Sequence, residues 1–557
     1  MFPFVKDCFT LDNITLDFGS RPEHRSVIDL LESMARILVI PLAMLAVIVS
    51  VSVYYWFAIP YDPRQPPRIR SNTPFLGHMI GLLRYGAGYY SKIAEECNLP
   101  PIFTLEIGRS RTYVVTSPHL AAVCDRRSRV VSFVPCAINF AQRILRASRR
   151  TMRLLSEDLA EEKGPVAAVG LRVENMRAIH QSLVPGEHLD EISRTMLTHL
   201  ANVFEAEFGG GGEEDKRIPL FRWIRNFVTI ASTDTLYGPE KNPMRDAEVM
   251  NGFWEVDRGF AMLGLAVFPD ILARKASRGR KRFVQGFLEY YAAGDGLATA
   301  SRLIQARYEV NRRYRVPHED IARFDLGVCT GLLVNTIPAI FWAVLRVFSD
   351  PDLLRELRQS LDDEMIAADL PKSSPTTTTI SISGAIKRCP LAESLVSEVL
   401  RIHSTNASAR VLLEDMAITD PSGGGTTYLL KKDSFLTVPS ALFHKNQALW
   451  GPSAGEFDPA RFGNVNNHQK VRPSANRTFG SGGALCPGRH FAMNEIMSFL
   501  VIALLRFDIE PVDDGVWTLP ASTHHISTSI LTPVEEVWVK VRPREGWQDV
   551  KKWDFVW

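Results

Sequence analysis

The chain has 557 residues, of which 46% are hydrophobic and 23% charged, and its formal net charge at pH 7 is +2. This composition is that of a globular protein, and it shows no overall basic character that would favour a nucleic acid as a partner. The seven cysteines are odd in number and form no C-x-x-C pair, so neither a disulfide framework nor a zinc knuckle is indicated.

The first predicted element is an uncharged run of 23 residues, 37–59. As a helix it is long enough to cross a hydrocarbon core of about 30 Å. Aromatic residues close the run, and arginines at 64, 68 and 70 follow it, which predicts that the next part of the chain is cytosolic. Because the run starts late and lacks a small-residue cleavage site, we favour a membrane anchor over a signal peptide.

Residues 1–36 contain four Lys or Arg and six Asp or Glu, so this segment is expected to be lumenal. Asn13 then lies in an accessible glycosylation sequon, N-I-T. The sequence therefore predicts a single-pass glycoprotein of the endoplasmic reticulum membrane with a cytosolic catalytic domain.

Residues 60–76 are rich in proline and predict a stiff spacer before one large domain, 77–557. Helical patterns dominate to about residue 310, for example over 189–207 and 282–314. The apolar stretch 324–347 contains Pro338 and is best explained as a buried central helix. The segment 372–384 reads as a Ser/Thr/Pro-rich loop and 421–427 as a hairpin turn, so the fold class is mainly α with a minor β-sheet.

The strongest chemical signal is the segment 479–488, F-G-S-G-G-A-L-C-P-G, which matches F-x-x-G-x-x-x-C-x-G. Its fixed positions are Phe479, Gly482, Cys486 and Gly488. Glycines let the backbone approach a flat macrocycle closely, and backbone N–H groups can tune a sulfur that ligates iron. The alternative is an inert cysteine in a turn before a helix.

Two further motifs precede this segment. Glu398 and Arg401 form E-x-x-R on a predicted helix, where residues three apart can pair. Arg461 lies in F-D-P-A-R-F at 457–462. In this order the motifs resemble those of the cytochrome P-450 family, and the resemblance covers nearly everything after the anchor. It implies a cytochrome P-450 fold preceded by the transmembrane helix, and a buried structural network of Glu398, Arg401 and Arg461.

The same resemblance implies haem b as the cofactor, with Cys486 as its axial metal ligand and Phe479, Gly482 and Gly488 in the cofactor loop. Arg410 stands where the family commonly places an arginine that binds a haem propionate. The family's usual basic residue two positions before the cysteine is replaced by Ala484, and no W-x-x-x-R is found in the early helix. Arg410, or one of the arginines within 143–153, is therefore expected to carry more of the propionate binding.

The family's oxygen-activating signature, A-G-x-(D/E)-T-T, is replaced here by G-L-L-V-N-T-I-P-A at 331–339. Asn335 takes the place of the threonine, and Val334 cannot relay a proton. Together with C-P-G-R-H-F-A at 486–492, this stretch looks like the branch that contains sterol 7α- and 12α-hydroxylases and prostacyclin synthase. We predict that Asn335 is a catalytic residue that holds water or a substrate oxygen; the alternative is that it satisfies a kink caused by Pro338.

The resemblance implies a monooxygenase that activates O₂ with electrons from NADPH-cytochrome P-450 reductase and oxidises a hydrophobic small molecule, such as a terpenoid, a sterol or another secondary metabolite. The changes at Val334 and Asn335 leave open an isomerase or dehydratase that rearranges a peroxide substrate and needs no reductase. A third reading is a membrane-tethered haem-binding or lipid-binding protein without catalysis, for which a thiolate ligand would be unnecessary.

Overall fold

The computed structural model describes residues 61–71, 73, 76–97, 99–161, 170–208, 216–367, 377–421, 425–463, 475–512, 515–545 and 552–557, together with Met44. The chain divides into two units, Met1–Pro60 and Tyr61–Trp557. Apart from Met44, the expected lumenal segment, the sequon at Asn13 and the anchor at 37–59 lie outside the described residues. They therefore stay predictions.

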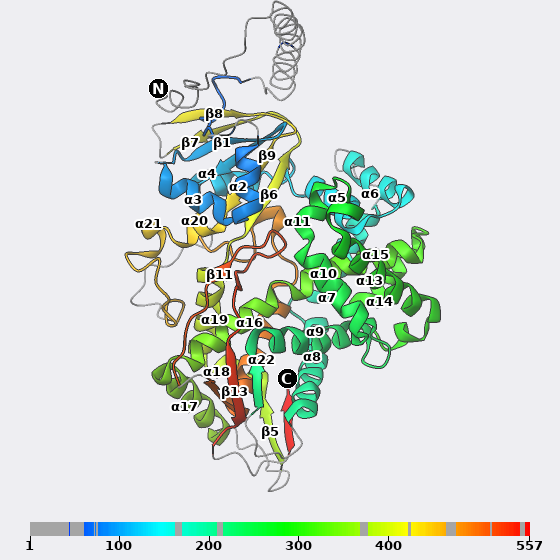
Figure 1. Ribbon diagram of the computed structural model, residues 1–557, viewed down its shortest axis with the longest axis vertical. Coiled ribbons are helices and arrows are strands. Elements are labelled where there is room, and N and C mark those ends of the chain that lie inside the picture. Colours follow the sequence, from blue (N-terminus) through cyan, green and yellow to red (C-terminus); the bar gives the residue numbers. More distant parts are fainter. Residues whose placement is uncertain are drawn as a thin grey trace, which may run out of the picture. The chain divides into compact units, whose positions relative to one another are not determined.

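The second unit is mainly helical with a minor sheet content, as the sequence predicts (Figure 1). Its helices are α2 (Gly77–Tyr85), α3 (Gly88–Glu96), α4 (Pro118–Arg126), α5 (Val134–Phe140), η1 (Ala141–Leu145), α6 (Arg149–Glu161), α7 (Leu171–Leu183), α8 (Glu187–Phe208), α9 (Leu220–Tyr237), η2 (Pro243–Arg245), α10 (Ala247–Arg258), α11 (Phe260–Leu265), α12 (Pro269–Leu272), α13 (Arg274–Ala293), η3 (Asp295–Ala298), α14 (Arg302–Arg313), α15 (His318–Leu333), α16 (Thr336–Phe348), α17 (Pro351–Ala367), α18 (Ile382–Arg388), α19 (Pro390–His403), α20 (Ser440–His444), α21 (Gln447–Trp450), η4 (Gly482–Ala484) and α22 (Arg489–Arg506). Its strands are β1 (Ile102–Ile107), β2 (Ser110–Val115), β3 (Val131–Ser132), β4 (Lys216–Pro219), β5 (Thr377–Ser381), β6 (Ala407–Leu412), β7 (Met416–Asp420), β8 (Thr426–Leu430), β9 (Phe435–Pro439), β10 (Phe507–Pro511), β11 (Ser522–Thr523), β12 (Thr532–Pro533), β13 (Trp538–Pro543) and β14 (Lys552–Val556).

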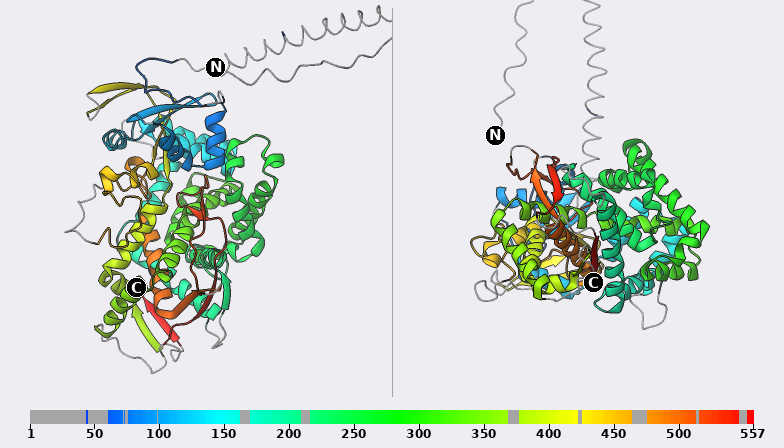
Figure 2. Two further views of the ribbon diagram at one scale, coloured as in Figure 1. Left: turned by 60° about the vertical axis from the view of Figure 1, so that its left-hand side comes forward. Right: turned by 90° about the horizontal axis from the view of Figure 1, so that it is seen from below.

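The largest sheet has the strand order β1-β2-β9-β6-β3 and lies at one end of this unit, while the long helices fill the rest (Figures 1 and 2). Only β2 and β9 pair in parallel; the other neighbours are antiparallel. Residues within the expected spacer join this sheet, because Thr104 donates its N–H to the Pro67 carbonyl (2.8 Å) and accepts from Ile69 (3.1 Å). Residues 67–69, within the expected spacer, therefore extend the sheet at β1.

The apolar stretch expected as a central helix is indeed buried. The apolar helical region His318–Phe348 is long enough to cross a membrane, yet 72% of its most apolar window is buried inside the protein. The prediction of one continuous helix is wrong, however, since α15 ends at Leu333 and α16 begins at Thr336. Pro338 has no N–H to donate to the carbonyl four residues earlier, at Val334, which accounts for the break at this point.

Two other expectations need correction. The helical pattern 282–314 is interrupted, because α13 ends before Gly294, whose φ of 76° closes the helix, and α14 begins at Arg302. The expected loop 372–384 contains β5, which pairs in parallel with β14 near the end of the chain. Such a pairing depends on a partner far away in sequence, so the polar composition of the segment concealed it. The hairpin expected around 421–427 is present as β7 and β8.

The helix that follows Cys486 carries a buried acid, Glu495 of α22. Its side chain is fully buried, and among the described residues the Ser232 hydroxyl of α9 is its hydrogen-bond donor. Burial raises the pKa of Glu495 to about 7, and the Ser232 hydrogen bond opposes that rise only in part. The folded protein therefore keeps this carboxyl protonated at pH values where the unfolded chain loses the proton.

This difference predicts a pH dependence of stability. Protonated Glu495 stabilises the folded state, and this stabilisation is fully present when the pH is below 4.5, the ordinary pKa of the carboxyl. It is lost as the pH rises through about 7, the pKa in the folded protein. The rise in the pKa of Glu495 corresponds to roughly 3 kcal/mol in the free energy of unfolding. We expect Glu495→Gln to remove this part of the pH dependence and to stabilise the protein above pH 7, measured as the denaturation midpoint between pH 5 and 8. Glu309→Gln, at an exposed site on α14, is the control; parallel profiles for wild type and Glu495→Gln would contradict the prediction.

Candidate active site

The cysteine loop lies between η4 and α22 and is closed by its own backbone. Cys486 donates its N–H to the carbonyl of Phe479 (2.8 Å). Gly480 and Gly482 have φ angles of 76° and 55°, a left-handed conformation that favours glycine. A Cβ on Gly482 would lie 2.7 Å from the backbone oxygen of Asp125. The glycines of the motif therefore allow the loop to turn tightly and to lie directly against α4.

The Cys486 sulfur lies just before the N-terminus of α22 and is partly buried. Burial raises the pKa of this thiol, while the backbone N–H of Gly488 and the charge of Arg489 lower it. At the buried Cys124, by contrast, burial raises the pKa to about 12. Cys486 is thus the cysteine whose sulfur meets a backbone donor and a helix N-terminus, as a thiolate ligand requires.

Arg410 of β6 lies beside the same loop, and the sequence prediction did not foresee its partners. Its Nη2 donates to the backbone oxygen of Ser481 (2.7 Å) and lies 3.1 Å from Asp125 Oδ1. Arg477 donates to both Asp125 oxygens (3.1 and 2.9 Å) and to the Ser481 hydroxyl (2.6 Å). This polar cluster, Asp125, Arg410, Arg477 and Ser481, fixes the cysteine loop against α4 and β6.

The residues present fit a haem group. Arg410 is 1% exposed, yet its Nη1 has no hydrogen-bond partner among the described residues, so a buried donor is left for an anionic group such as a propionate. Gly331 on α15 is exposed although the helix is central, and a Cβ built there would meet nothing within 4 Å. A cysteine whose sulfur can become a thiolate ligand, a buried guanidinium and open space beside the central helix are the features that an iron porphyrin needs.

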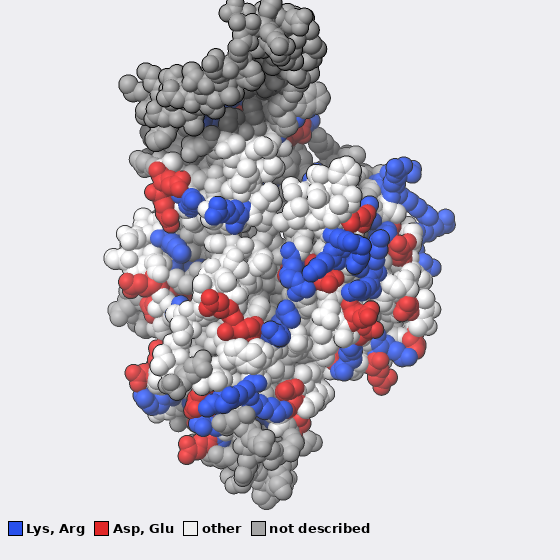
Figure 3. Space-filling view, in the orientation of Figure 1, with Lys and Arg blue, Asp and Glu red and all other residues white. Residues whose placement is uncertain are grey.

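The arginines within 143–153 do not join Arg410. They are solvent-exposed, and two of them contact another region: Arg143 donates to the Gly264 carbonyl (3.0 Å) and Arg146 lies 3.6 Å from Asp270. Lys and Arg gather over the helices on the right of Figure 3, with acidic side chains among them. Of the two alternatives for propionate binding, Arg410 or an arginine within 143–153, the structure places only Arg410 beside the cysteine loop, and Arg477, nine residues before the cysteine, lies next to it.

Asn335 lies at the break between α15 and α16. Its amide oxygen accepts the backbone N–H of Ser529 (2.6 Å), so it ties the central helix to the segment 524–531 near the end of the chain. The alternative that this side chain satisfies the kink is not what the structure shows. Because the bond uses the amide oxygen, the Asn335 side chain can offer its N–H₂ group to water or substrate.

The E-x-x-R pair and the later arginine meet in one buried network. Arg401 forms two bonds of 2.7 Å to the Glu398 carboxylate, and Arg461 donates to the same carboxylate at 3.0 Å. The side chains of Glu398 and Arg401 have no exposed area. These groups hold α19 to the loop before the cysteine.

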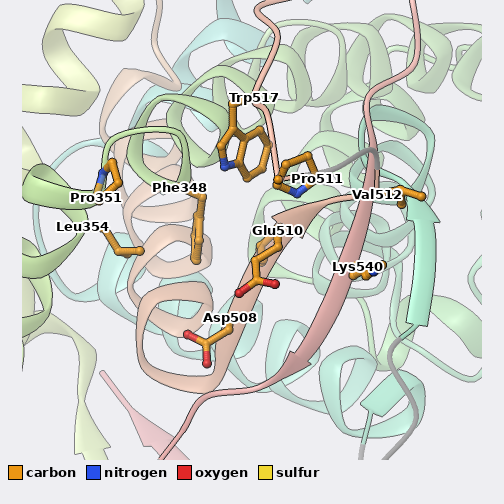
Figure 4. A pocket seen from close by; sticks show the side chains of 11 residues that line it. Phe348, Pro351, Leu354, Asp508, Glu510, Pro511, Val512, Trp517 and Lys540 are labelled. Atoms are coloured by element: carbon orange, nitrogen blue, oxygen red, sulfur yellow. The ribbon is translucent and has the colours of Figure 1, made fainter.

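A separate pocket of about 470 Å³ opens between the end of α16, the start of α17, β10 and β13 (Figure 4). Its two acidic side chains already form ion pairs: Asp508 lies 2.9 Å from Arg358, and Glu510 lies 2.6 Å from Arg542. None of the predicted site residues lines it. This pocket therefore adds nothing to the site at Cys486.

Comparisons with known proteins agree with this geometry. The family model described as Cytochrome P450 matches residues 296–536. Cytochrome P450 monooxygenase nodJ of Hypoxylon pulicicidum is 32% identical over 503 residues, which cover 89% of this chain and 92% of the relative. Cholesterol 7-alpha-monooxygenase of Cricetulus griseus is 24% identical (67% of this chain, 76% of the relative), and prostacyclin synthase of Bos taurus is 23% identical (86% and 95%).

The two last relatives belong to the branch that the short motifs at 331–339 and 486–492 indicated, so the predicted resemblance is confirmed. The family implies a haem-thiolate cofactor, hydrophobic substrates and a redox partner. Since the match to a 32% identical relative extends over nearly the whole chain, this protein belongs to the cytochrome P450 family of monooxygenases.

Proposed function

We propose that the enzyme binds haem b through Cys486 and hydroxylates or otherwise oxidises a hydrophobic small molecule, with a terpenoid, a sterol or another secondary metabolite as the substrate class. The observation that carries the proposal is the pairing of a donor-stabilised cysteine loop with the buried, partner-less Nη1 of Arg410. When bound, the haem would supply activation of O₂, and a thiolate ligand favours cleavage of the O–O bond.

Each named residue has a distinct task in this proposal. Cys486 supplies the thiolate, and the N–H of Gly488 moderates its charge. Arg410 binds a propionate in a site that Asp125 and Arg477 hold rigid. Gly331 leaves room beside the central helix for substrate, and Asn335 holds a water molecule or a substrate oxygen there.

The proposed redox partner is NADPH-cytochrome P-450 reductase, and the proposed location is the endoplasmic reticulum membrane with the catalytic domain in the cytosol. The uncharged run 37–59 and the arginines that follow it support a single-pass anchor. A membrane location suits a substrate that partitions into lipid. Cholesterol 7-alpha-monooxygenase among the relatives supports a sterol or a similar lipophilic molecule.

The second candidate is an isomerase or dehydratase that rearranges a peroxide without a reductase. Two observations favour it: Val334 and Asn335 stand where the family usually has an acid and an alcohol, and prostacyclin synthase is among the relatives. Val334 is buried and cannot move a proton, so any proton delivery at this break must pass through water held by Asn335 or by the neighbouring segment.

Reconstitution with purified reductase separates the two candidates. A monooxygenase should be reduced by NADPH through the reductase, measured as formation of the carbon monoxide complex, and its turnover with O₂ should require both NADPH and the reductase. Rapid consumption of cumene hydroperoxide without NADPH, together with no reductase-dependent reduction, would support the peroxide enzyme and overturn the monooxygenase proposal.

Asn335 offers a further prediction. Alanine at this position leaves the partly buried N–H of Ser529 without its acceptor, a loss of about 1 kcal/mol. We expect Asn335→Ala to lower the thermal midpoint and to weaken substrate binding, whereas Asn335→Asp keeps an acceptor and restores most of the midpoint. The readouts are thermal unfolding and the spectral dissociation constant of 1-octylimidazole. Equal midpoints for wild type and Asn335→Ala would show that the bond to Ser529 is unimportant.

A further inference from the structure

The polar cluster beside the cysteine loop carries more positive than negative charge. Arg410 and Arg477 are each 1% exposed, and both pair with the carboxylate of Asp125 (3.1 and 2.9 Å). Two guanidinium groups and one carboxylate give these three side chains a formal charge of +1. A charge in a protein interior is strongly unfavourable unless an opposite charge or a set of hydrogen bonds compensates it. The cluster therefore needs an anion in addition to Asp125.

Three neighbouring titratable groups do not supply that anion. Burial raises the pKa of Cys124 to about 12 and the pKa of Cys136 to about 11, so both thiols are neutral at physiological pH. His444 accepts the backbone N–H of Arg477 at its Nε2 atom (2.9 Å), and burial lowers the pKa of this imidazole to about 3. His444 is therefore neutral as well, and none of the three groups changes the charge of the cluster.

The surplus positive charge lies on the side of Arg410. The Asp125 carboxylate already accepts two hydrogen bonds from Arg477 and one from the Ser481 hydroxyl (2.9 Å). Arg410 pairs with it through Nη2, and the buried Nη1 of Arg410 has no hydrogen-bond partner among the described residues. Burial lowers the pKa of Arg410, Asp125 opposes this fall, and the charge of Arg477 adds to it. Two arginines thus share one carboxylate, and a buried donor remains for a second anion.

The cluster lies directly against the loop of the proposed iron ligand, because Ser481 is five residues before Cys486. The backbone oxygen of Ser481 accepts Arg410 Nη2 (2.7 Å), and its hydroxyl accepts Arg477 Nη2 (2.6 Å). The same backbone oxygen accepts the N–H of Ala484 (3.1 Å), the residue at the position where the family usually has a base. Both guanidinium groups therefore meet the loop at one residue, and Arg477 brings to it a cation that Ala484 does not provide.

We infer that Arg477 and Asp125 are positioning residues that set the positive charge around the haem carboxylates. Arg477 supplies a cation from outside the family's usual position, and Asp125 holds it beside Arg410 while cancelling one of the two positive charges. The inference rests on the proposed function, because the haem is the source of the second anion. It deepens that function, since the pair then controls how firmly the haem is held and how readily its iron is reduced.

Variants that change the charge of the cluster test this inference in the full-length, haem-loaded protein without substrate. Arg477→Met removes the cation at similar side-chain length, and Asp125→Asn removes the anion at nearly the same shape. Each protein is reduced anaerobically in equilibrium with a dye of known potential, safranin T, and the ratio of reduced to oxidised haem is read from the absorption spectrum. This readout requires neither turnover nor the reductase.

The two variants should shift the redox equilibrium in opposite directions, because a nearby positive charge favours the state that has gained an electron. Loss of the Arg477 charge should lower the equilibrium constant for reduction by about three-fold or more, and loss of the Asp125 charge should raise it by a similar factor. Damage that merely opened the loop to water would shift both variants in the same direction. Arg477→Met should also release haem to apomyoglobin about three-fold faster than wild type, because the haem carboxylates lose a cation.

Two further variants assign the effect to charge in the cluster. Arg477→Lys keeps the cation and should bring the equilibrium constant to within about two-fold of wild type, although the planar guanidinium is lost. Arg126→Met removes an exposed arginine next to Asp125 on α4, where water and salt screen the charge, and should leave the equilibrium constant unchanged. If Asp125→Asn does not load with haem, the comparison of Arg477→Met with Arg477→Lys decides alone.

The outcomes separate this inference from the proposed function. Equal equilibrium constants in wild type, Arg477→Met and Arg477→Lys would overturn the inference, and so would shifts of the same sign in Arg477→Met and Asp125→Asn. In both cases a thiolate-type carbon monoxide band in the variants would leave the haem-thiolate function standing. Absence of that band from folded, haem-loaded wild type would overturn the proposed function, and the inference with it.

Discussion

Cys486→Ala is expected to abolish the thiolate-type Soret band of the reduced carbon monoxide complex and all NADPH-dependent turnover. Alanine removes the one side chain that the loop presents beside the N–H of Gly488, and no other cysteine shares that environment in the described chain. Without the sulfur, the electron density that favours O–O cleavage is lost. The measurement is the reduced carbon monoxide difference spectrum of the variant beside that of wild type.

Controls separate loss of the ligand from loss of the fold. Cys97→Ala removes an exposed free thiol and should leave the spectrum unchanged. Cys486→Ser preserves the loop's volume, so its thermal midpoint should stay close to that of wild type while the thiolate band disappears. A thiolate-type band that persists in both Cys486 variants would show that another residue ligates the iron and would remove the basis of the site.

The parts of the site that the sequence predicts are those coded within short segments. The cysteine loop follows from glycines within a few residues of Cys486, and two of them, Gly480 and Gly482, adopt the left-handed φ angles that favour this residue. The central helix follows from its apolar length and from Pro338. The contact made at the break does not, because Asn335 accepts the N–H of Ser529, 194 residues later.

The parts that the sequence does not predict depend on distant partners. Arg477 and Asp125 are 352 residues apart, and only the folded chain shows that they hold Arg410 in place. The family pattern has a basic residue two positions before the cysteine, where this chain has Ala484, and it contains no signal for Arg477, nine positions before the cysteine. Strand β5 was concealed in the same way, since its partner β14 lies near the end of the chain.

Glu398→Ala is expected to destabilise the protein by about 3–5 kcal/mol, the usual cost of removing one partner from a buried ion pair. Arg401 and Arg461 would both lose their carboxylate, and neither can move to water, because their side chains are almost fully buried. Arg401 also donates to the Ala454 carbonyl (2.7 Å), so the damage should spread to the loop that leads to Cys486.

The readouts for Glu398→Ala are the thermal midpoint and the fraction of purified protein that retains haem, and both should fall. Glu398→Gln keeps an acceptor for Arg401 and should lie between the alanine variant and wild type. Glu393→Ala, at an exposed position in the first turn of the same helix, is the matched control and should behave as wild type. If Glu398→Ala matched Glu393→Ala in both readouts, the network would not stabilise the cysteine loop. A fall confined to Glu398→Ala would instead show that a buried charge network is required to keep the haem ligand in position.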